Sequence, residues 1–268
     1  MTDLGECSRA RAPFYEPAGD EIDLFEAAHA ERLPLMLKGP TGCGKTRFVE
    51  YMAWRLQRPL ITVACHEDLS AADLVGRHLL DADGTAWQDG PLTHAVRHGA
   101  ICYLDEIVEA RQDSVVVIHP LTDSRRLLPL ERRNELLPAH PDFQLVISYN
   151  PGYQGLAKNL KESTKQRFTA IEFDWPSVER EIIIVAAEAG IDARSARALV
   201  NIAGHSRKLV GRGLDEGLST RMLIHAGRLL RRNLSFSAAC RAALIVPLTD
   251  DGDVRATLED IVTACADG

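Results

Sequence analysis

The sequence predicts an α/β domain built on a parallel sheet, followed by a smaller domain made only of helices. Two observations support this fold class. Five short, almost continuously apolar runs are typical of strands covered on both faces, and they lie at 33–37, 60–64, 100–104, 143–149 and 170–174. The segments between the first four runs, such as 45–57, are long enough for crossover helices, which favours right-handed parallel connections.

The character of the chain changes after Pro176. Helical periodicity, with Ser, Asp or Gly at the segment ends, predicts helices at 178–190, 192–204, 219–233 and 235–246. We therefore expect two domains, an α/β domain over 1–176 and a helical domain over 177–268.

The composition of the chain indicates which kinds of partner and which cellular compartment to expect. Of 268 residues, 46% are hydrophobic and 26% charged, and the net charge is -7, which argues against nucleic acid as the main partner. No apolar run approaches the roughly 20 residues needed to cross a bilayer, and the first thirty residues are too acidic for a signal peptide. The six cysteines form no CxxC pair, which indicates reduced thiols in a cytoplasmic protein. Together with the short apolar runs, this predicts a cytoplasmic protein without a membrane segment.

The segment GPTGCGKT stands between the first strand and the first crossover helix, where a phosphate-binding loop is expected. Its backbone N–H groups and the start of the helix would surround phosphate oxygens. Lys45 would reach the β- and γ-phosphates of ATP, and the Thr46 hydroxyl would ligate Mg²⁺. Cys43 is either a small space-filling residue or a redox-sensitive one. The predicted nucleotide-binding residues are Gly39, Pro40, Thr41, Gly42, Cys43, Gly44, Lys45, Thr46 and Arg47.

Two carboxylates follow the third apolar run, in AICYLDE. The carboxyl ends of parallel strands are where open α/β sheets bind their ligands. We assign Asp105 to the Mg²⁺ ion and Glu106 to the attacking water, which it would orient and deprotonate. The alternative is a pair of surface acids after a strand.

Asn150 ends the fourth apolar run and precedes Pro151 and Gly152. All three are turn-forming residues, so a simple turn is one interpretation. If this strand runs between the phosphate-loop strand and the Asp105 strand, the Asn150 amide would end beside the γ-phosphate. There it could hold the hydrolytic water or report loss of the phosphate by hydrogen bonding. Both interpretations can hold together.

Two arginines complete the predicted catalytic set. Arg167 precedes the fifth strand, where it could stabilise a transferring phosphoryl group in a neighbouring molecule, or could belong to a solvated cationic corner. Arg221 lies in the first turn of a predicted helix, where the helix dipole disfavours a cation. We therefore expect an anion beside it, either a nucleotide phosphate or a nearby carboxylate.

His94 and His98 are four residues apart on a predicted helix and could share a metal ion, but no third ligand is evident and we do not predict a metal site there. The short basic clusters near 125 and 231 are predicted to be solvated helix faces or subunit contacts and not nucleic-acid contacts.

In this order, the motifs resemble those of AAA+ ATPases. The phosphate loop is similar to Walker A (39–46), the acidic strand end to Walker B (101–106), Asn150 to sensor 1, Arg167 to the arginine finger and Arg221 to sensor 2. Strings such as WQDGPLTHAVRHGAICYLDEIVEARQD and GLDEGLSTRML resemble the CbbQ/NorQ branch of MoxR-type AAA+ proteins, and the resemblance covers nearly the whole chain. It implies two insertions, one in the helix after the second strand at about 79–91 and a hairpin at about 127–137.

The resemblance also implies a function. Such proteins form hexameric rings with a partner that carries a von Willebrand factor A domain, and they use ATP and Mg²⁺ to remodel an enzyme. The strings look closest to CbbQ, which implies a CbbO-type partner and Rubisco as client, freed of inhibitory sugar phosphates. One alternative is NorQ-like maturation of nitric oxide reductase or another metalloenzyme. Another, from a different class, is an AAA+ nucleic-acid loader or translocase, which would be stimulated by DNA or RNA.

Overall fold

The computed structural model describes residues 12–81, 84–150, 160–211 and 213–266, which cluster into two compact units. Of the described residues, unit 1 holds Gly19–Gly39 and Lys45–Phe173, together with Ala12 and Pro13. Unit 2 holds Asp174–Gly268 and the short segments Phe14–Ala18 and Pro40–Gly44. The main change of unit, after Phe173, lies close to the boundary that the sequence suggests at Pro176.

Unit 1 is built on a five-stranded, all-parallel sheet with the strand order β2-β5-β8-β1-β9. Each strand coincides, within one or two residues, with one of the five predicted apolar runs, so the predicted fold class is confirmed. Strand β8 lies between β5 and β1, as the argument about Asn150 requires. The strands are β1 (Leu35–Lys38), β2 (Leu60–Ala64), β5 (Ile101–Asp105), β8 (Gln144–Tyr149) and β9 (Thr169–Glu172).

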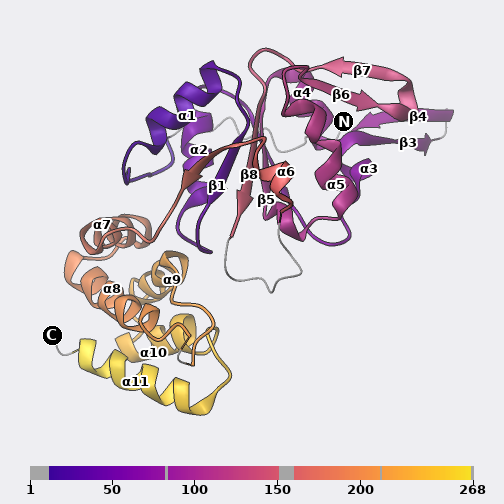
Figure 1. Ribbon diagram of the computed structural model, residues 1–268. Helices are drawn as coiled ribbons and strands as arrows, with labels where there is room; N and C mark the ends of the chain where they lie inside the picture. Colours follow the sequence, from indigo (N-terminus) through magenta and orange to yellow (C-terminus); the bar gives the residue numbers. More distant parts are fainter. Residues whose placement is uncertain (1–11, 82–83, 151–159, 212, 267–268) are drawn as a thin grey trace. The chain divides into compact units, whose positions relative to one another are not determined.

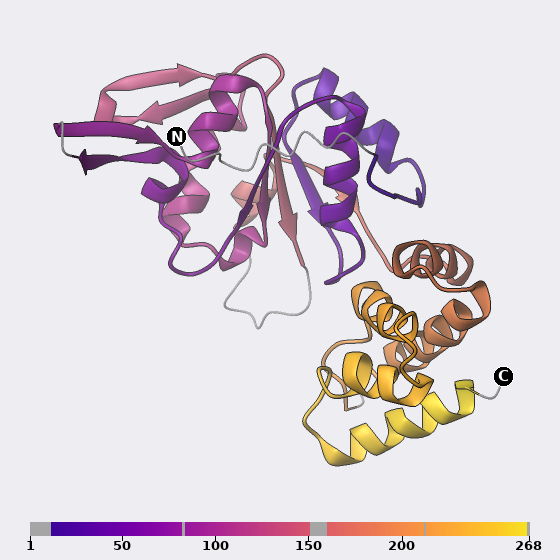
Figure 2. The ribbon, with the colours of Figure 1, turned by 180° about the vertical axis from the view of Figure 1, so that it is seen from behind.

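Helices cover both faces of this sheet, with α1 and α2 on one side and α4 and α5 on the other (Figures 1 and 2). On the α4 side, Leu92 and Val96 are fully buried in one core cluster with Leu104 and Ile147 of the sheet. On the other side, the Phe48 ring lies 5.6 Å from that of Phe25. The helical segments of unit 1 are α1 (Glu21–Ala30), α2 (Lys45–Arg55), α3 (Ala71–Val75), α4 (Pro91–His98), η1 (Ile107–Glu109), α5 (Gln112–Val117), η2 (His119–Leu121), η3 (Glu131–Arg133) and α6 (Glu162–Lys165).

Two antiparallel hairpins extend from unit 1 and lie side by side in both ribbon views (Figures 1 and 2). The β6–β7 hairpin (Leu127–Leu130 and Glu135–Pro138) lies where the sequence predicts one. The β3–β4 hairpin (Gly76–Asp81 and Gly84–Asp89) separates α3 from α4 and occupies the insertion expected at about 79–91, although it begins earlier, at Gly76. Arg97 of α4 joins the two hairpins through ion pairs with Asp89 at 2.9 Å and Glu135 at 3.1 Å.

Unit 2 is helical, as predicted. Serine or aspartate residues cap its first four helices, because the side chains of Ser177, Asp192, Ser219 and Ser235 each accept an N–H three residues further on. The segment predicted as one helix at 235–246 is a short α-helix continued by a π-helical turn, Arg241–Ile245. The α-helices are α7 (Val178–Ala189), α8 (Ala193–Arg207), α9 (Thr220–Leu230), α10 (Phe236–Cys240) and α11 (Gly252–Ala266).

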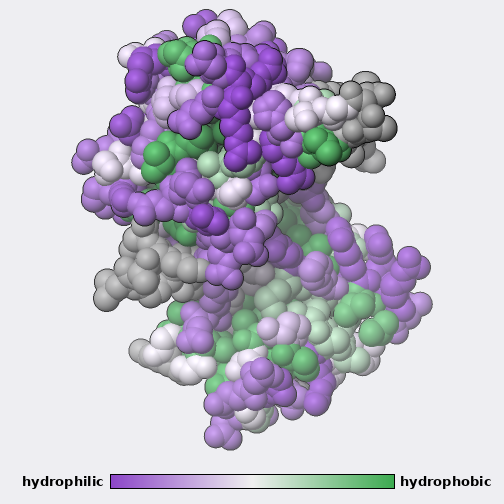
Figure 3. All heavy atoms as spheres, turned by 90° about the vertical axis from the view of Figure 1, so that its right-hand side faces the viewer, coloured by the Kyte–Doolittle hydropathy of each residue, from purple (hydrophilic) through white to green (hydrophobic). Residues whose placement is uncertain are grey.

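Hydrophilic residues dominate the outer surface on the face shown in Figure 3, and hydrophobic residues there occur in separate groups. The most exposed large apolar side chains are on the hairpins, where Leu80 is 86% and Leu136 is 66% exposed. Within the described ranges, no helix combines the length and the apolar character that crossing a membrane requires.

Candidate functional site

Residues of the predicted site lie at the carboxyl ends of three neighbouring strands of unit 1, at the same edge of the sheet. Gly39 follows β1, Asp105 ends β5 with Glu106 directly behind it, and Asn150 follows β8. Because these strands are parallel and adjacent, their carboxyl ends meet, and ligands of open α/β sheets bind at such an edge. Lys45, at the start of α2, reaches this edge from the loop after β1.

The Lys45 ammonium group joins the ends of β1 and β8. It is 7% exposed, and its Nζ donates hydrogen bonds to the Gly39 carbonyl oxygen at 2.7 Å and to Asn150 Oδ1 at 2.6 Å. A buried cation requires such acceptors, because leaving water without them is costly. The structure therefore brings together Lys45, Gly39 and Asn150, as the sequence predicts. The turn expected at Pro151 and Gly152 lies outside the described residues.

Gly39 can only be a glycine at this position. A Cβ added to it would lie 2.4 Å from the carbonyl oxygen of Phe173, which is far inside van der Waals contact. Its N–H donates to the Tyr149 carbonyl oxygen at 3.2 Å, which fixes the start of the loop to the end of β8. The close packing of these backbones sets the point from which the phosphate loop leaves the sheet.

The two oxygens of Asp105 have different surroundings. Oδ1 accepts hydrogen bonds from the Tyr103 hydroxyl at 2.7 Å and from Ser148 Oγ at 2.6 Å. Oδ2 lies 3.4 Å from Thr46 Oγ1. A carboxylate and a hydroxyl oxygen are ligands that Mg²⁺ prefers. The donor set of Thr46 and Asp105 thus fits the predicted magnesium site, with one carboxylate oxygen held by the protein and the other facing Thr46.

Tyr103 and Ser148 are site residues that the sequence alone did not identify. Both side chains are fully buried. Ser148 Oγ also accepts the N–H of Glu106 at 2.7 Å, so one hydroxyl contacts both members of the acidic pair. Burial and the Asp105 carboxylate raise the pKa of the Tyr103 phenol, which therefore stays protonated and donates. A serine that interrupts the apolar run QLVISY was the available signal.

Glu106 has an unusual backbone conformation. Its φ of 57° and ψ of 49° lie in the left-handed region, which is uncommon for a residue with a side chain. Such strain persists only where surrounding contacts impose it, and it is concentrated at functional sites. The Glu106 N–H bond to Ser148 supplies one such contact. The side chain of Glu106 is exposed, as a residue that activates solvent water requires.

Cys65, after β2, lies beside the acidic pair, but its thiol is not suited to act as a nucleophile there. Its N–H donates to the Asp105 carbonyl oxygen at 2.9 Å. Burial, with the carboxylates of Asp105 and Glu106, raises the pKa of its thiol to about 12. The thiol is therefore protonated at neutral pH and is a poor nucleophile.

Replacement of Ser148 by Ala should lower the rate of ATP hydrolysis about tenfold or more. The change removes a hydrogen bond to a charged carboxylate, worth about 1.5–3 kcal/mol, and frees the Glu106 backbone. Phosphate release at saturating ATP measures the effect. Ser114→Ala is a matched control, because Ser114 is also fully buried, and within the described residues its hydroxyl donates to the Leu69 carbonyl oxygen, at 2.7 Å, and to no carboxylate. Equal losses in both variants would show that Ser148 acts through stability alone.

Arg167 is not part of the Lys45–Asp105 cluster. It lies between α6 and β9, and its N–H donates to the Thr164 carbonyl oxygen at 3.1 Å. Its side chain is exposed and takes part in no ion pair within the part of the chain that the structure describes. Arg47, by contrast, pairs with Glu50 at 3.2 Å on the surface of α2.

Arg221 belongs to unit 2, as the second residue of α9. Its side chain is exposed, and no carboxylate pairs with it among residues 12–81, 84–150, 160–211 and 213–266. The carboxylate that the sequence left open as its partner is therefore not found. The loop residues Pro40–Gly44 also group with unit 2, whereas Gly39, Lys45, Thr46 and Arg47 group with unit 1.

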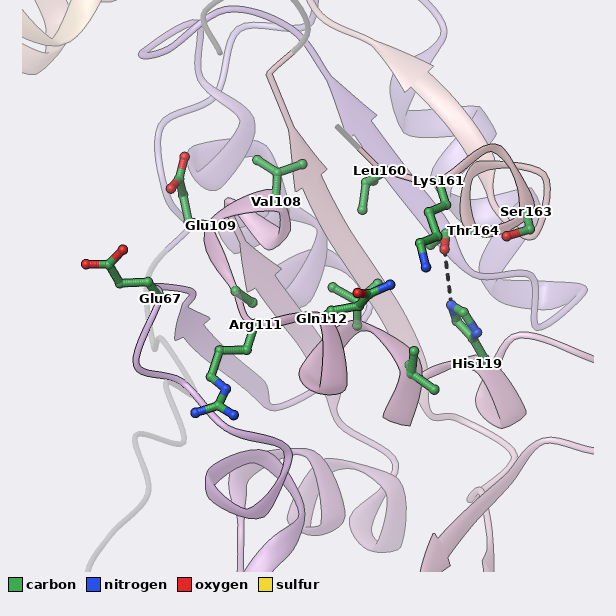
Figure 4. Close-up of a pocket in the computed structure, with 13 residues that line it drawn as sticks. Glu67, Val108, Glu109, Arg111, Gln112, His119, Leu160, Lys161, Ser163 and Thr164 are labelled. Carbon is green, nitrogen blue, oxygen red and sulfur yellow. Dashed lines mark hydrogen bonds between the residues drawn. The ribbon is translucent and has the colours of Figure 1, made fainter. Parts of the chain in front are cut away.

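A cavity of about 520 Å³ opens beside η1 and α5 of unit 1 (Figure 4). Its lining comes from η1, which follows Glu106, from α5 and from α6, which precedes Arg167. His119 Nε2 and Thr164 Oγ1 lie 3.2 Å apart and connect η2 with α6 at one wall (Figure 4). Lys45, Thr46, Asp105 and Asn150, all described residues, do not line this cavity, so it is separate from the predicted nucleotide site.

The rings of His94 and His98 lie against each other, with 4.5 Å between their centroids. Within the described part of the chain, no group of three or more His, Cys, Asp or Glu side chains could hold a metal ion.

Two family models match the chain. One, described as an AAA domain of the dynein-related subfamily, matches residues 34–168, and the other, described as the CbbQ/NirQ/NorQ C-terminal region, matches residues 181–265. The first contains Lys45, Asp105, Glu106 and Asn150, and the second contains Arg221.

Individual proteins are similar to the chain in sequence or in structure. The protein CbbQ of Hydrogenophilus thermoluteolus is 65% identical over 246 residues, which are 92% of each chain. The protein NorQ of Paracoccus denitrificans is 59% identical over 253 residues, which are 94% of each chain. The solved structure of a mutant RuvB from Thermotoga maritima is similar with a TM-score of 0.56 and 16% identity, covering 91% of this chain and 69% of the other, which shows a shared fold.

Proposed function

Because the chain belongs to the CbbQ/NirQ/NorQ family of AAA+ ATPases, we propose that it is the ATP-driven motor of a protein-remodelling machine of the CbbQ type. ATPase activity follows from the family. The observation that carries the site assignment is the convergence of Lys45, Asp105 and Asn150 at one edge of the sheet, with the strained Glu106 beside them.

Each residue has a distinct task in this proposal. Lys45 binds the β- and γ-phosphates, and Glu106 orients the attacking water and accepts its proton. The Asn150 amide contacts the γ-phosphate and responds to its loss. Thr46 and Asp105 would hold Mg²⁺, whose positive charge would neutralise phosphate oxygens. Tyr103 and Ser148 keep the Asp105 carboxylate in a fixed orientation.

Hydrolysis then depends on assembly. The exposed Arg167, which has no ion-pair partner among the described residues, contacts the phosphates bound to a neighbouring copy in a hexameric ring, and thereby completes that copy's site. Arg221 supplies a second cation from the helical unit. A cation at the start of α9 is disfavoured by the helix dipole, so a bound phosphate is a suitable partner for it.

The client of the machine is proposed from sequence similarity. Identity to CbbQ exceeds identity to NorQ, at 65% against 59%. This favours Rubisco as the client, with a CbbO-type von Willebrand factor A protein as partner in the cytoplasm. Nitric oxide reductase maturation is the second candidate, because NorQ is nearly as similar over the same part of the chain.

The client is tested with the chain alone, with its von Willebrand factor A partner, and with the partner plus inhibited Rubisco. Phosphate release and recovered carboxylase activity are both measured. We expect partner and Rubisco together to stimulate hydrolysis and to restore carboxylation, and a Lys45→Ala chain to do neither. Stimulation by immature nitric oxide reductase and not by Rubisco would favour the second candidate. Stimulation by DNA or RNA alone would contradict both.

A further inference from the structure

We propose that a buried cluster in unit 2, formed by Glu181, Arg207 and Thr220 and here called the Glu181 cluster, positions Arg221 toward nucleotide. The inference rests on the proposed nucleotide contact of Arg221. It assigns a positioning role to three residues that lie outside the phosphate site and come from three different helices, α7, α8 and α9.

The Glu181 carboxylate is the centre of the cluster and is 1% exposed. Arg207 donates to both of its oxygens, from Nη2 at 2.7 Å and from Nη1 at 2.8 Å. Thr220 Oγ1 donates to Oε1 at 2.6 Å. A carboxylate at this depth requires a paired cation and further donors, and here it has both. The geometry of the three side chains is therefore closely defined.

The cluster holds the chain just before Arg221. Arg207 also donates to the Leu218 carbonyl oxygen, from Nε at 3.1 Å and from Nη2 at 3.0 Å. Ser206 Oγ accepts the Leu218 N–H at 3.1 Å. Ser219 then caps α9, and Thr220 is tied to Glu181. Each of the three residues that precede Arg221 is thus fixed by a hydrogen bond that involves a side chain.

Arg221, unlike Glu181 and Thr220, is not buried. Its side chain is exposed and forms no ion pair within the described residues, although it stands where the helix dipole opposes a cation. The Glu181 carboxylate, bonded to the adjacent Thr220, is already paired with Arg207 and forms no ion pair with Arg221 among the described residues. Hydrogen bonds hold the backbone before Arg221, and its guanidinium forms no ion pair with the described residues, which is the arrangement that presenting a cation to a phosphate requires.

The cluster also contacts the segment that joins β9 to α7. The Arg207 guanidinium lies over the ring of Trp175, 4.1 Å from its centroid. The same side chain thus contacts the connecting segment, Glu181 and the residue before the α9 cap. Arg207 therefore links the connecting segment to the residues that support Arg221.

A double-mutant cycle with Thr220→Val and Arg221→Ala tests the proposal. Val keeps the volume of Thr and removes the hydroxyl. We expect Thr220→Val to lower kcat for ATP hydrolysis about fivefold to tenfold, and Thr220→Ser to stay within about twofold of the wild type. Added to Arg221→Ala, Thr220→Val should have no further effect, because it acts only through Arg221. Arg241→Ala, which breaks an exposed pair with Glu259 in the same unit, is the control.

Affinity for a fluorescent ATP analogue is measured for the same variants, with thermal unfolding of each. Equal losses from Thr220→Val in both backgrounds would overturn the inference, because the cluster would then act through general stability. A large effect of Arg221→Ala with none of Thr220→Val would also overturn it while leaving the proposed function intact. No effect of Arg221→Ala on either readout would refute the nucleotide contact itself. Absence of hydrolysis by the wild type would count against the proposed function, and analogue affinity would still decide the cycle.

Discussion

A Glu106→Gln chain is expected to bind ATP with nearly unchanged affinity and to hydrolyse it about 10²–10⁴ times more slowly, the usual contribution of a general base. Gln keeps the size of the side chain, but it cannot accept the proton of the attacking water. The backbone conformation of Glu106 is set by its surroundings and not by its charge, so the site should keep its shape. Phosphate release and ATP affinity are measured on the same preparation.

Glu109→Gln is a suitable control for this variant. Glu109 lies on η1, the short helix that begins directly after Glu106, so the same charge is removed close by. Hydrolysis by the control should stay within about twofold of the wild type. Near-normal turnover by Glu106→Gln would refute its assignment as the base.

Arg167→Ala is expected to abolish hydrolysis, because an arginine supplied from a neighbouring molecule contributes about 10³–10⁵-fold to phosphoryl transfer. ATP binding to each chain should persist, since Arg167 is not part of the cluster that Lys45 forms with Gly39 and Asn150 in the same chain. Mixing Arg167→Ala chains with Lys45→Ala chains should partly restore activity. A Lys45→Ala neighbour can still supply its arginine to a chain whose own phosphate loop is intact.

Lys165→Ala is the matched control for Arg167, because it removes another cation of the same corner, one that pairs with Glu162 at 2.9 Å. It should leave hydrolysis within about twofold. If mixed rings are shown to form and no activity returns, Arg167 does not act between subunits.

The sheet was predictable from the sequence because its strands are buried on both faces. Such strands are continuous apolar runs, and the polar residues that follow them mark the ligand edge. The sequence alone therefore predicts that Lys45, Asp105 and Asn150 lie together. The unit 2 helices were predictable for a different reason, since Ser177, Asp192 and similar caps mark where each begins.

Residues that act through strand pairing could not be found in the same way. Ser148 contacts Asp105 because Leu104 pairs with Ile147, so the next residues of β5 and β8 lie beside each other. The sequence does not state this register. The Glu181 cluster was equally hidden, because its residues are 39 positions apart at the widest and meet only when α7, α8 and α9 pack.

The β3–β4 hairpin shows another limit. Its insertion was expected from family resemblance, but its β conformation was not, because its strands are mostly exposed and bury few side chains. The half-buried Trp87 lies against His78 across the hairpin, with 5.1 Å between ring centroids, and the Arg133 guanidinium lies 5.9 Å from its ring. The β3–β4 hairpin therefore has contacts with the β6–β7 hairpin, but its sequence lacks the alternating apolar pattern that would have predicted its strands.

The central claim is that Lys45, Thr46, Asp105, Glu106 and Asn150 form the site of ATP hydrolysis. Its most direct test is an experimental structure of the Glu106→Gln chain with ATP and Mg²⁺, in which the atoms around the γ-phosphate are measured. We expect Lys45 Nζ and the Asn150 amide within hydrogen-bonding distance of γ-phosphate oxygens, and Mg²⁺ beside Thr46 and Asp105. A γ-phosphate that contacts neither Lys45 nor Asn150 would contradict the account.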